Sequence, residues 1–238
     1  MEKNPDKDQL DRLADGPYFV DNLSAHGPEL AALLEGSTPR KYAAGEVVYS
    51  EGEEGRRFYF VLSGRVKISI TNRAGYEKIL AICGSQTFVG EHIMEHHTYG
   101  ATATALEASE LCAIESQRFE SLAMEKPSVG LMILKCVKTK LTVLARQIAD
   151  LRFLTAQGKV VHALLEMVDR AGRKTPDGVA VPQKITHETI ANLTGLSRPT
   201  VTLILNELER QKVLRKRRGS LVIVDREGLE RIFTGDVL

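Results

Sequence analysis

A stripe of apolar residues, spaced alternately three and four positions apart, constrains this chain more than any other feature. The stripe consists of Leu134, Val137, Leu141, Leu144, Ile148 and Leu151. Such a spacing keeps one narrow face of an α-helix apolar and is typical of a coiled-coil seam. A helix packed on its own domain is the alternative, but it would carry a broader apolar face. We therefore predict a long helix over residues 127–154 whose stripe joins two copies of the chain in a homodimer.

The residues before this helix predict a β-sandwich. Between residues 38 and 115, short stretches of strand character are separated by glycines at short intervals. Many short strands with regular turns are typical of a sandwich or barrel. One strand face is expected to carry Val66, Ile68 and Ile70. The predicted fold class is α+β, with a jelly-roll sandwich over residues 16–126 that follows a flexible tail over residues 1–15.

The residues after the helix predict a winged helix-turn-helix. Thr186 and Ser197 can each cap a helix, and the glycine between them can adopt the left-handed conformation that a tight turn needs. Residues 214–224 indicate two strands with a basic tip, and residues 170–178 indicate a polar loop. We assign residues 155–238 to this domain.

The second helix of this unit has a face suited to reading DNA bases. An arginine near the start of such a helix can bridge O6 and N7 of guanine, and nearby hydroxyls can bind phosphates. The predicted DNA-binding residues are Thr186, Glu188, Ser197, Arg198, Pro199, Thr200, Thr202, Leu203, Asn206, Arg217 and Arg218.

Charge is distributed unevenly along the chain. Residues 155–238 hold 14 lysines and arginines against 10 acidic residues, whereas residues 1–154 hold 18 against 21. Four consecutive basic residues, 215–218, lie near the tip of the wing, where each phosphate contact would steepen the salt dependence of binding. The asymmetry favours double-stranded DNA as the partner of the C-terminal domain.

The composition excludes several other classes. No run approaches the 18 apolar residues of a membrane span. The acidic N-terminus lacks the basic start and apolar run of a secretory signal, so we expect a cytoplasmic protein without membrane contact. Three widely spaced cysteines, with no Cys-x-x-Cys pair, argue against a disulfide framework or a zinc site.

These features together resemble the CRP/FNR family of bacterial transcription regulators over nearly the whole chain. The segment GEVVYSEGEEGRRFYFVLSGRVKIS, residues 45–69, is similar to the family's cyclic-nucleotide-binding-type sandwich. The segment ITHETIANLTGLSRPTVTLILNELERQKVL, residues 185–214, is similar to its helix-turn-helix. The resemblance implies a homodimeric regulator without enzymatic activity, an effector pocket that faces the central helix, and a hinge near residues 153–154.

The resemblance breaks down where cyclic AMP would bind. In cyclic-AMP-binding members, a Gly-Glu pair holds the ribose and a later Arg-Ser pair holds the phosphate. Gly90 and Glu91 keep the first pair, but Tyr99 and Gly100 stand in the place of the second. The phosphate would therefore lose its bidentate cation. Residues 144–145 are leucine and alanine where hydroxyls would receive adenine, so cyclic AMP is not the predicted effector.

The sequence leaves several candidates for the effector. An iron–sulfur sensor is excluded because no cysteine precedes Cys83. Residues 101–107 and 145–147 are similar to regulators that sense chlorinated aromatics. Haem or a metal ion is an alternative, with the ligands His92, His96 and His97, although no cofactor is firmly predicted. The predicted pocket consists of Gly90, Glu91, His92, Tyr99, Gly100, Ala101, Lys138, Thr142, Leu144 and Ala145.

Two rival classes are weaker. A metal-dependent jelly-roll enzyme would need a His-x-His pair, whereas His96 and His97 are adjacent and would point to opposite faces of a strand. A nucleotide-gated signalling module without DNA contact is disfavoured by Tyr99 and by the basic wing.

The recognition helix also departs from the family pattern. Pro199 and Leu203 replace a glutamate and a second arginine. We expect an operator that differs from that of the cyclic AMP receptor and is palindromic, with half-sites about one turn of DNA apart. An activator of this type would also contact RNA polymerase.

Overall fold

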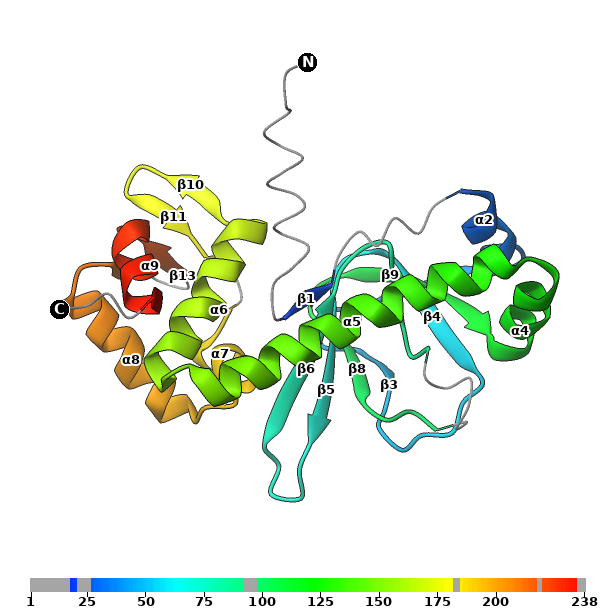
Figure 1. Ribbon diagram of the computed structural model, residues 1–238, viewed down its shortest axis with the longest axis horizontal. Coiled ribbons are helices and arrows are strands. Elements are labelled where there is room, and N and C mark those ends of the chain that lie inside the picture. The colour runs from blue at the N-terminus through cyan, green and yellow to red at the C-terminus, as the bar shows by residue number, and fades with distance from the viewer. Residues whose placement is uncertain (1–17, 21–26, 92–97, 182–184, 218–219, 235–238) are drawn as a thin grey trace, which may run out of the picture. The chain divides into compact units, whose positions relative to one another are not determined.

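The computed structural model describes residues 18–20, 27–91, 98–181, 185–217 and 220–234. The chain divides into two compact units, one formed by residues 18–145 and the other beginning at Arg146. The first is a β-sandwich and the second is mostly helical (Figure 1). Helix α5 (Pro127–Phe153) contributes residues to both.

Two sheets form the sandwich, as the sequence predicted. One sheet contains β1 (Phe19–Val20), β3 (Val47–Tyr49), β5 (Val66–Thr71), β6 (Glu77–Cys83) and β8 (Thr102–Ala105), in the order β1-β6-β5-β8-β3. The other contains β2 (Pro39–Tyr42), β4 (Arg57–Ser63), β7 (Thr87–Val89) and β9 (Ser109–Glu115), in the order β2-β9-β4-β7. Adjacent strands are antiparallel except β1 and β6. Helices α2 (Pro28–Leu34) and α4 (Ser116–Glu125) complete the unit.

Aromatic rings fill the centre of the sandwich. The ring of Phe88 lies 5.0 Å from that of Phe60 and 6.0 Å from that of Phe58, which meets Phe119 of α4 edge-on at 5.6 Å. Such pairs contribute about 0.5–1.5 kcal/mol each beyond the area they bury. Helix α5 closes this core with Val129, Ile133, Cys136 and Val143. These four side chains define the face of α5 that packs on the sandwich.

The predicted apolar face of β5 is buried over only part of the strand. Between Ile68 and Ser69 the pairing with β6 shifts by one residue, and the extra residue of this bulge is Leu80 of β6. The pairing of β5 with β8 has no such shift, so the alternation within β5 is kept. Val66 is buried, whereas Ile70, toward the end of the strand, is exposed.

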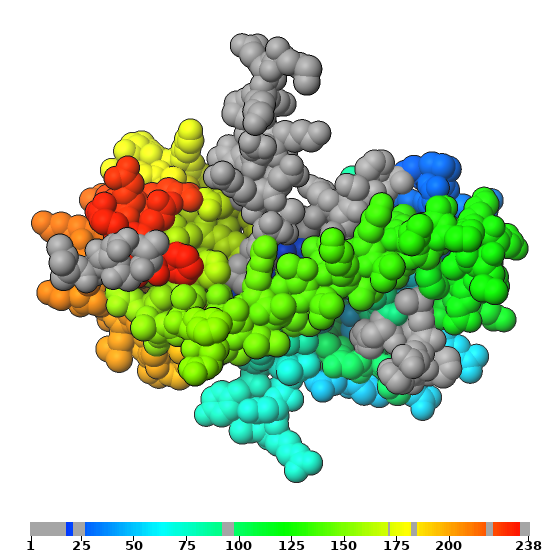
Figure 2. All heavy atoms as spheres, viewed as in Figure 1, coloured from blue at the N-terminus to red at the C-terminus, as the bar shows by residue number. Residues whose placement is uncertain are grey.

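One side of α5 remains uncovered. Figure 2 shows the helix, in green, at the surface of its unit. The exposed apolar residues of the predicted stripe are Leu134, Val137, Leu141, Ile148 and Leu151. Leu144 is half-buried instead. A repeat of 3.5 residues drifts by about 20° per heptad on a helix of 3.6 residues per turn, so Leu144 lies at the border between the stripe and the buried face.

The second unit combines four helices with a small sheet. The helices are α6 (Ala156–Ala171), α7 (His187–Thr194), α8 (Arg198–Arg210) and α9 (Arg226–Thr234). The sheet contains β10 (Arg173–Thr175), β11 (Gly178–Ala180), β12 (Leu214–Arg217) and β13 (Ser220–Ile223), in the order β10-β11-β13-β12.

A hairpin replaces the polar loop predicted over residues 170–178. The two strands of this hairpin, β10 and β11, have only three residues each, and no apolar alternation marks them. Their backbone ladder is extended by β13, which pairs with β11 at Val179 and Ala180. Pairing with a distant strand therefore determines the conformation of this segment, although its local sequence indicates a turn.

The helix-turn-helix forms as the sequence predicted. The side chains of Thr186 and Ser197 cap α7 and α8 by accepting hydrogen bonds from the backbone N–H groups of Thr189 and Thr200. Gly195 ends α7 with φ of 71°, the left-handed conformation that the turn requires. These contacts fix the start of α8, where the candidate base-reading residues lie.

Candidate nucleic-acid interface and effector cavity

The outward face of α8 exposes most of the predicted base-contacting side chains. Its inward face is anchored by the fully buried Val201, Leu205 and Leu208. This amphipathic division leaves exposed the residues Arg198, Pro199, Leu203 and Asn206. An exposed leucine on a recognition face could meet the methyl group of thymine, and 69% of Leu203 is accessible.

Arg198 lies at the N-terminal end of this face. Its nearest acidic partner is Glu188, in the first turn of α7, at 4.0 Å. Their side chains are 70% and 61% exposed. A pair this open to water is worth little, so Arg198 can exchange it for a base edge at small energetic cost.

The predicted phosphate-binding hydroxyls have local partners. Thr186 Oγ1 accepts from the N–H of Thr189 at 3.0 Å, and Ser197 Oγ accepts from the N–H of Thr200 at 3.2 Å. Ser197 Oγ also lies 2.8 Å from Thr200 Oγ1. The structure thus places these hydroxyls at the helix N-termini, where they cap the helices.

Thr202 is linked to a residue that the sequence analysis missed. Its hydroxyl donates to the carbonyl of Arg198 at 3.0 Å and lies 2.9 Å from Nδ1 of His187. Because the hydroxyl hydrogen is used, the imidazole must donate through Nδ1–H. Burial and the positive charges of Lys216 and Arg198 lower the pKa of His187. No pattern in the sequence singles out this histidine, since its partner lies one helix away.

Acidic side chains hold the cations of the wing. Arg217 and Arg215 both pair with Asp177, which lies between β10 and β11, and the second pair measures 3.6 Å. Arg218 lies outside the described residues. The two arginines of the wing that the structure describes therefore share one carboxylate.

Lys216 points from the wing toward α8. Its ammonium contacts Glu209 at 3.2 Å and also the side-chain oxygen of Asn206. The backbone N–H of Lys216 donates to Glu209 at 3.0 Å. These contacts tie the wing to the second half of α8.

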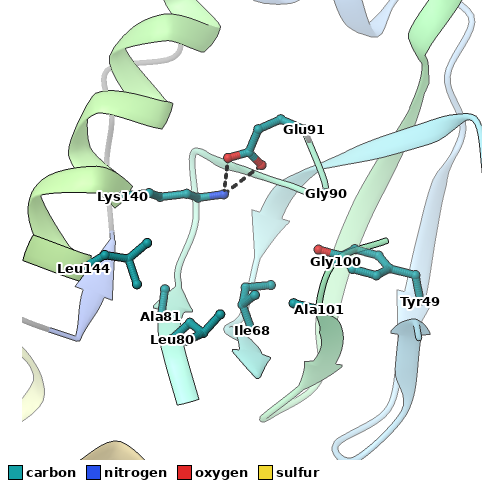
Figure 3. A pocket seen from close by; sticks show the side chains of 10 residues that line it. All are labelled: Tyr49, Ile68, Leu80, Ala81, Gly90, Glu91, Gly100, Ala101, Lys140 and Leu144. Atoms are coloured by element: carbon teal, nitrogen blue, oxygen red, sulfur yellow. Dashed lines mark hydrogen bonds and ion pairs between the residues drawn. The ribbon is translucent and has the colours of Figure 1, made fainter. Parts of the chain in front are cut away.

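A separate cavity of about 230 Å³ lies within the sandwich unit. Strands β3, β5 and β6, the segments directly after β7 and directly before β8, and helix α5 surround it (Figure 3). Its lining consists of Tyr49, Ile68, Leu80, Ala81, Gly90, Glu91, Gly100, Ala101, Lys140 and Leu144. Five of the predicted pocket residues are among them, namely Gly90, Glu91, Gly100, Ala101 and Leu144.

A buried ion pair crosses the cavity. The ammonium of Lys140 lies 2.6 and 2.8 Å from the two carboxylate oxygens of Glu91, and 2.7 Å from the carbonyl of Phe88 (Figure 3). Burial alone would lower the pKa of Lys140, but the attraction of Glu91 outweighs it and raises the pKa above its usual value. Lys140 is therefore charged, and its three N–H donors are all used.

Lys140 was not among the predicted pocket residues, although its position on α5 indicates a buried cation. This lysine lies one turn after Cys136 and just before Val143, both on the buried face of α5. A cation on that face requires a buried partner, and Glu91 was already a candidate.

The other predicted pocket residues lie elsewhere. Tyr99 is 3% exposed, donates its hydroxyl to the carbonyl of Arg57 at 2.6 Å, and stacks on Tyr49 at 3.9 Å. It therefore supports the cavity without lining it. Lys138 and Ala145 are exposed and Thr142 donates to the carbonyl of Lys138, so the structure does not bring these three into the cavity.

The histidine alternative falls outside the structure. His92, His96 and His97 are not among the described residues. Within the described part of the chain, no group of three or more histidine, cysteine or carboxylate side chains could hold a metal ion. None of the three cysteines, all buried, forms a disulfide. No described helix is both long enough and apolar enough to span a membrane.

Both halves of the chain match known families. Residues 39–126 match the cyclic nucleotide-binding domain, and residues 158–232 match the Crp-like helix-turn-helix domain. Among solved structures, the c-di-GMP responsive global regulator CLP of Xanthomonas campestris has the same fold, with a TM-score of 0.76. It is 24% identical, and the match covers 82% of this chain and 97% of that one.

The relatives are transcription regulators. The CRP-like cAMP-activated global transcriptional regulator of Mycobacterium tuberculosis is 30% identical over 203 residues, which cover 85% of this chain and 91% of that protein. The cAMP-activated global transcriptional regulator CRP of Salmonella typhimurium is 27% identical, with 82% and 94% covered. The metal-enzyme alternative is thereby excluded. From the matching sandwich, the matching helix-turn-helix and the extent of these similarities, the chain belongs to the CRP/FNR family of DNA-binding transcription regulators.

Proposed function

We propose that the chain acts as an effector-controlled homodimer that reads a palindromic operator through Arg198 of each subunit. In this proposal residues 16–126 sense the effector, residues 127–154 join the subunits and residues 155–238 bind DNA. The observation that carries the proposal is the exposed side chain of Arg198 at the first position of α8. Residues at the N-terminus of a recognition helix reach base edges in the major groove.

The uncovered stripe on α5 supports the dimer. Members of this family bind DNA as dimers. Leu141 and Ile148, two turns apart on α5, are 66% and 67% exposed. Apolar residues repeated along one helix face in this way favour contact with a second copy of the same helix. Two recognition helices related by a twofold axis would then face half-sites about one turn of DNA apart.

The cavity supports an effector other than cyclic AMP, although the relatives named above are cAMP-activated. A cyclic phosphate needs a cation with free N–H donors. In the described lining the sole cation is Lys140, and Glu91 and the Phe88 carbonyl use its donors. Tyr99 and Gly100, in the place of the family's Arg-Ser pair, add no positive charge. If the effector turns the protein into an activator, RNA polymerase is its second macromolecular partner, after the operator DNA.

Selection of binding sites from random DNA, followed by footprinting, tests the proposal. We expect a palindrome, and we expect Arg198→Ala to relax the preference for one base pair per half-site by about 1–3 kcal/mol. Arg210→Ala is the matched control, because Arg210 is a 76% exposed arginine at the other end of α8. An asymmetric single site, or equal effects of the two variants, would refute the proposal.

A further inference from the structure

The described lining of the cavity is electrically neutral. Glu91 and Lys140 are the only charged side chains that line it among the described residues, and they pair with each other. Their side chains are 10% and 17% exposed, so solvent screens them weakly. A charged ligand would add one uncompensated charge to this interior, which is costly. The lining therefore selects against both anions and cations.

The hydroxyl of Tyr49 has no hydrogen-bond partner among the residues that the structure describes. Tyr49 is 2% exposed, and its Oη makes no hydrogen bond to any described residue. In Figure 3 the ring extends from β3 with its hydroxyl directed into the space between Glu91 and Ala101. Burial raises the pKa of Tyr49, so the hydroxyl keeps its proton and can donate. A buried polar group in this state is normally satisfied by hydrogen bonding.

Apolar side chains form the rest of the wall. They are Ile68, Leu80, Ala81, Ala101 and Leu144. The cavity volume of about 230 Å³ exceeds the roughly 150 Å³ of an engineered apolar cavity that accepts benzene. The space thus fits a ring of this size with a short substituent.

We propose that the effector is a small uncharged molecule with an apolar body and one hydroxyl or carbonyl oxygen, which accepts a hydrogen bond from Tyr49. This inference rests on the proposed function, because it assigns the ligand class to the effector cavity of the regulator. The Lys140–Glu91 pair excludes charged analogues, and Tyr49 distinguishes oxygen-bearing molecules from plain hydrocarbons.

Calorimetric titration of the full chain at neutral pH tests the ligand class. The probes are benzyl alcohol, toluene, benzoate and benzylammonium, which share a ring and differ in polarity and charge, together with cyclic AMP. We expect benzyl alcohol to bind at least about tenfold more tightly than any of the others. Tighter binding of benzoate, benzylammonium or cyclic AMP, or no saturable binding of benzyl alcohol, would overturn the inference.

Tyr49→Phe tests the hydrogen bond. We expect this variant to bind benzyl alcohol and toluene within about threefold of each other. Without ligand it should melt at the same temperature as the parent or higher, because the substitution removes an unsatisfied buried hydroxyl. Tyr76→Phe removes a hydroxyl from a 73% exposed tyrosine and should change neither quantity. A lowered melting temperature for Tyr49→Phe, with unchanged selectivity, would show that the hydroxyl serves the fold and not a ligand.

Glu91→Gln tests the neutrality of the lining. It leaves Lys140 with one unbalanced positive charge, so benzoate should gain at least about tenfold in affinity relative to benzyl alcohol. Unchanged discrimination against benzoate would contradict the inference. Operator binding is measured separately on the parent chain. If the operator is bound but the probes fail, the ligand class is wrong and the proposed regulator stands, whereas loss of operator binding would refute the proposed function itself.

Discussion

Gly90 and Gly75 share one backbone conformation in different surroundings. Both have φ of 82°, a left-handed value that costs other residues about 1–2 kcal/mol. A Cβ on Gly90 would lie 3.1 Å from Cε1 of Tyr49 and 3.3 Å from Cε1 of Tyr99. A Cβ on Gly75 would have no neighbour within 4 Å. Two independent reasons therefore favour glycine at position 90: its left-handed backbone conformation and the close approach of the stacked tyrosines.

We expect Gly90→Ala to destabilise the sandwich more than Gly75→Ala does. Gly75→Ala should lower the free energy of unfolding by about 1–2 kcal/mol. Gly90→Ala should lower it by about 1–3 kcal/mol more, because the added methyl group crowds the packed tyrosine rings. Urea denaturation followed by tyrosine fluorescence measures both. Equal losses would mean that the stack moves aside freely, and that Gly90 serves only the turn.

At the scale of elements, the contact between two hairpins limits the charge that the wing can offer to DNA. Asp177, in the β10–β11 hairpin, pairs with Arg215 and Arg217 of β12. We expect Asp177→Asn to raise the affinity for DNA and to steepen the log–log salt slope by about 1–2, because each arginine released can neutralise a phosphate. Fluorescence anisotropy at several salt concentrations measures the slope.

Asp169→Asn provides the control for this prediction. Asp169 is as exposed as Asp177, at 33%, and also pairs with an arginine, Arg226 of α9. Both substitutions change the net charge equally, but only one frees residues of the wing. Equal gains in affinity from the two variants would show that net charge, and not the wing, is responsible.

The elements also show how far the sequence determines the structure. Local signals sufficed for the helix-turn-helix, because Thr186, Gly195 and Ser197 act on neighbouring backbone groups. They failed for the β10–β11 hairpin, because β11 pairs with β13, which lies more than 40 residues further along the chain. The bulge at Leu80 of β6 could not be predicted either, since it depends on the register between β5 and β6. Only half of the predicted pocket residues line the cavity, for the same reason. The wall from β3 and β6 forms only when distant strands meet, and the Lys140–Glu91 pair forms only when α5 packs on the sandwich.

For the molecule as a whole, the proposal depends on the stripe of α5. Leu141→Glu would place two carboxylates opposite each other in an apolar seam, where burying charge is costly. We expect the dimer dissociation constant, measured by analytical ultracentrifugation, to rise at least about a hundredfold, which corresponds to roughly 3 kcal/mol. Met124→Glu is the control, because Met124 is an 86% exposed apolar residue on α4, outside the stripe.

The same variant separates the dimer from DNA recognition. If α5 holds the recognition helices in register, Leu141→Glu should weaken binding to the palindrome and abolish its dependence on half-site spacing, since a lone subunit contacts one half-site only. Binding to an isolated half-site should stay within about threefold of the parent, because Arg198 and the wing lie in the other unit and are unchanged. Retained dependence on spacing in a variant that sediments as a monomer would mean that the subunits associate through another surface, and that the exposed leucines of α5 serve a different partner.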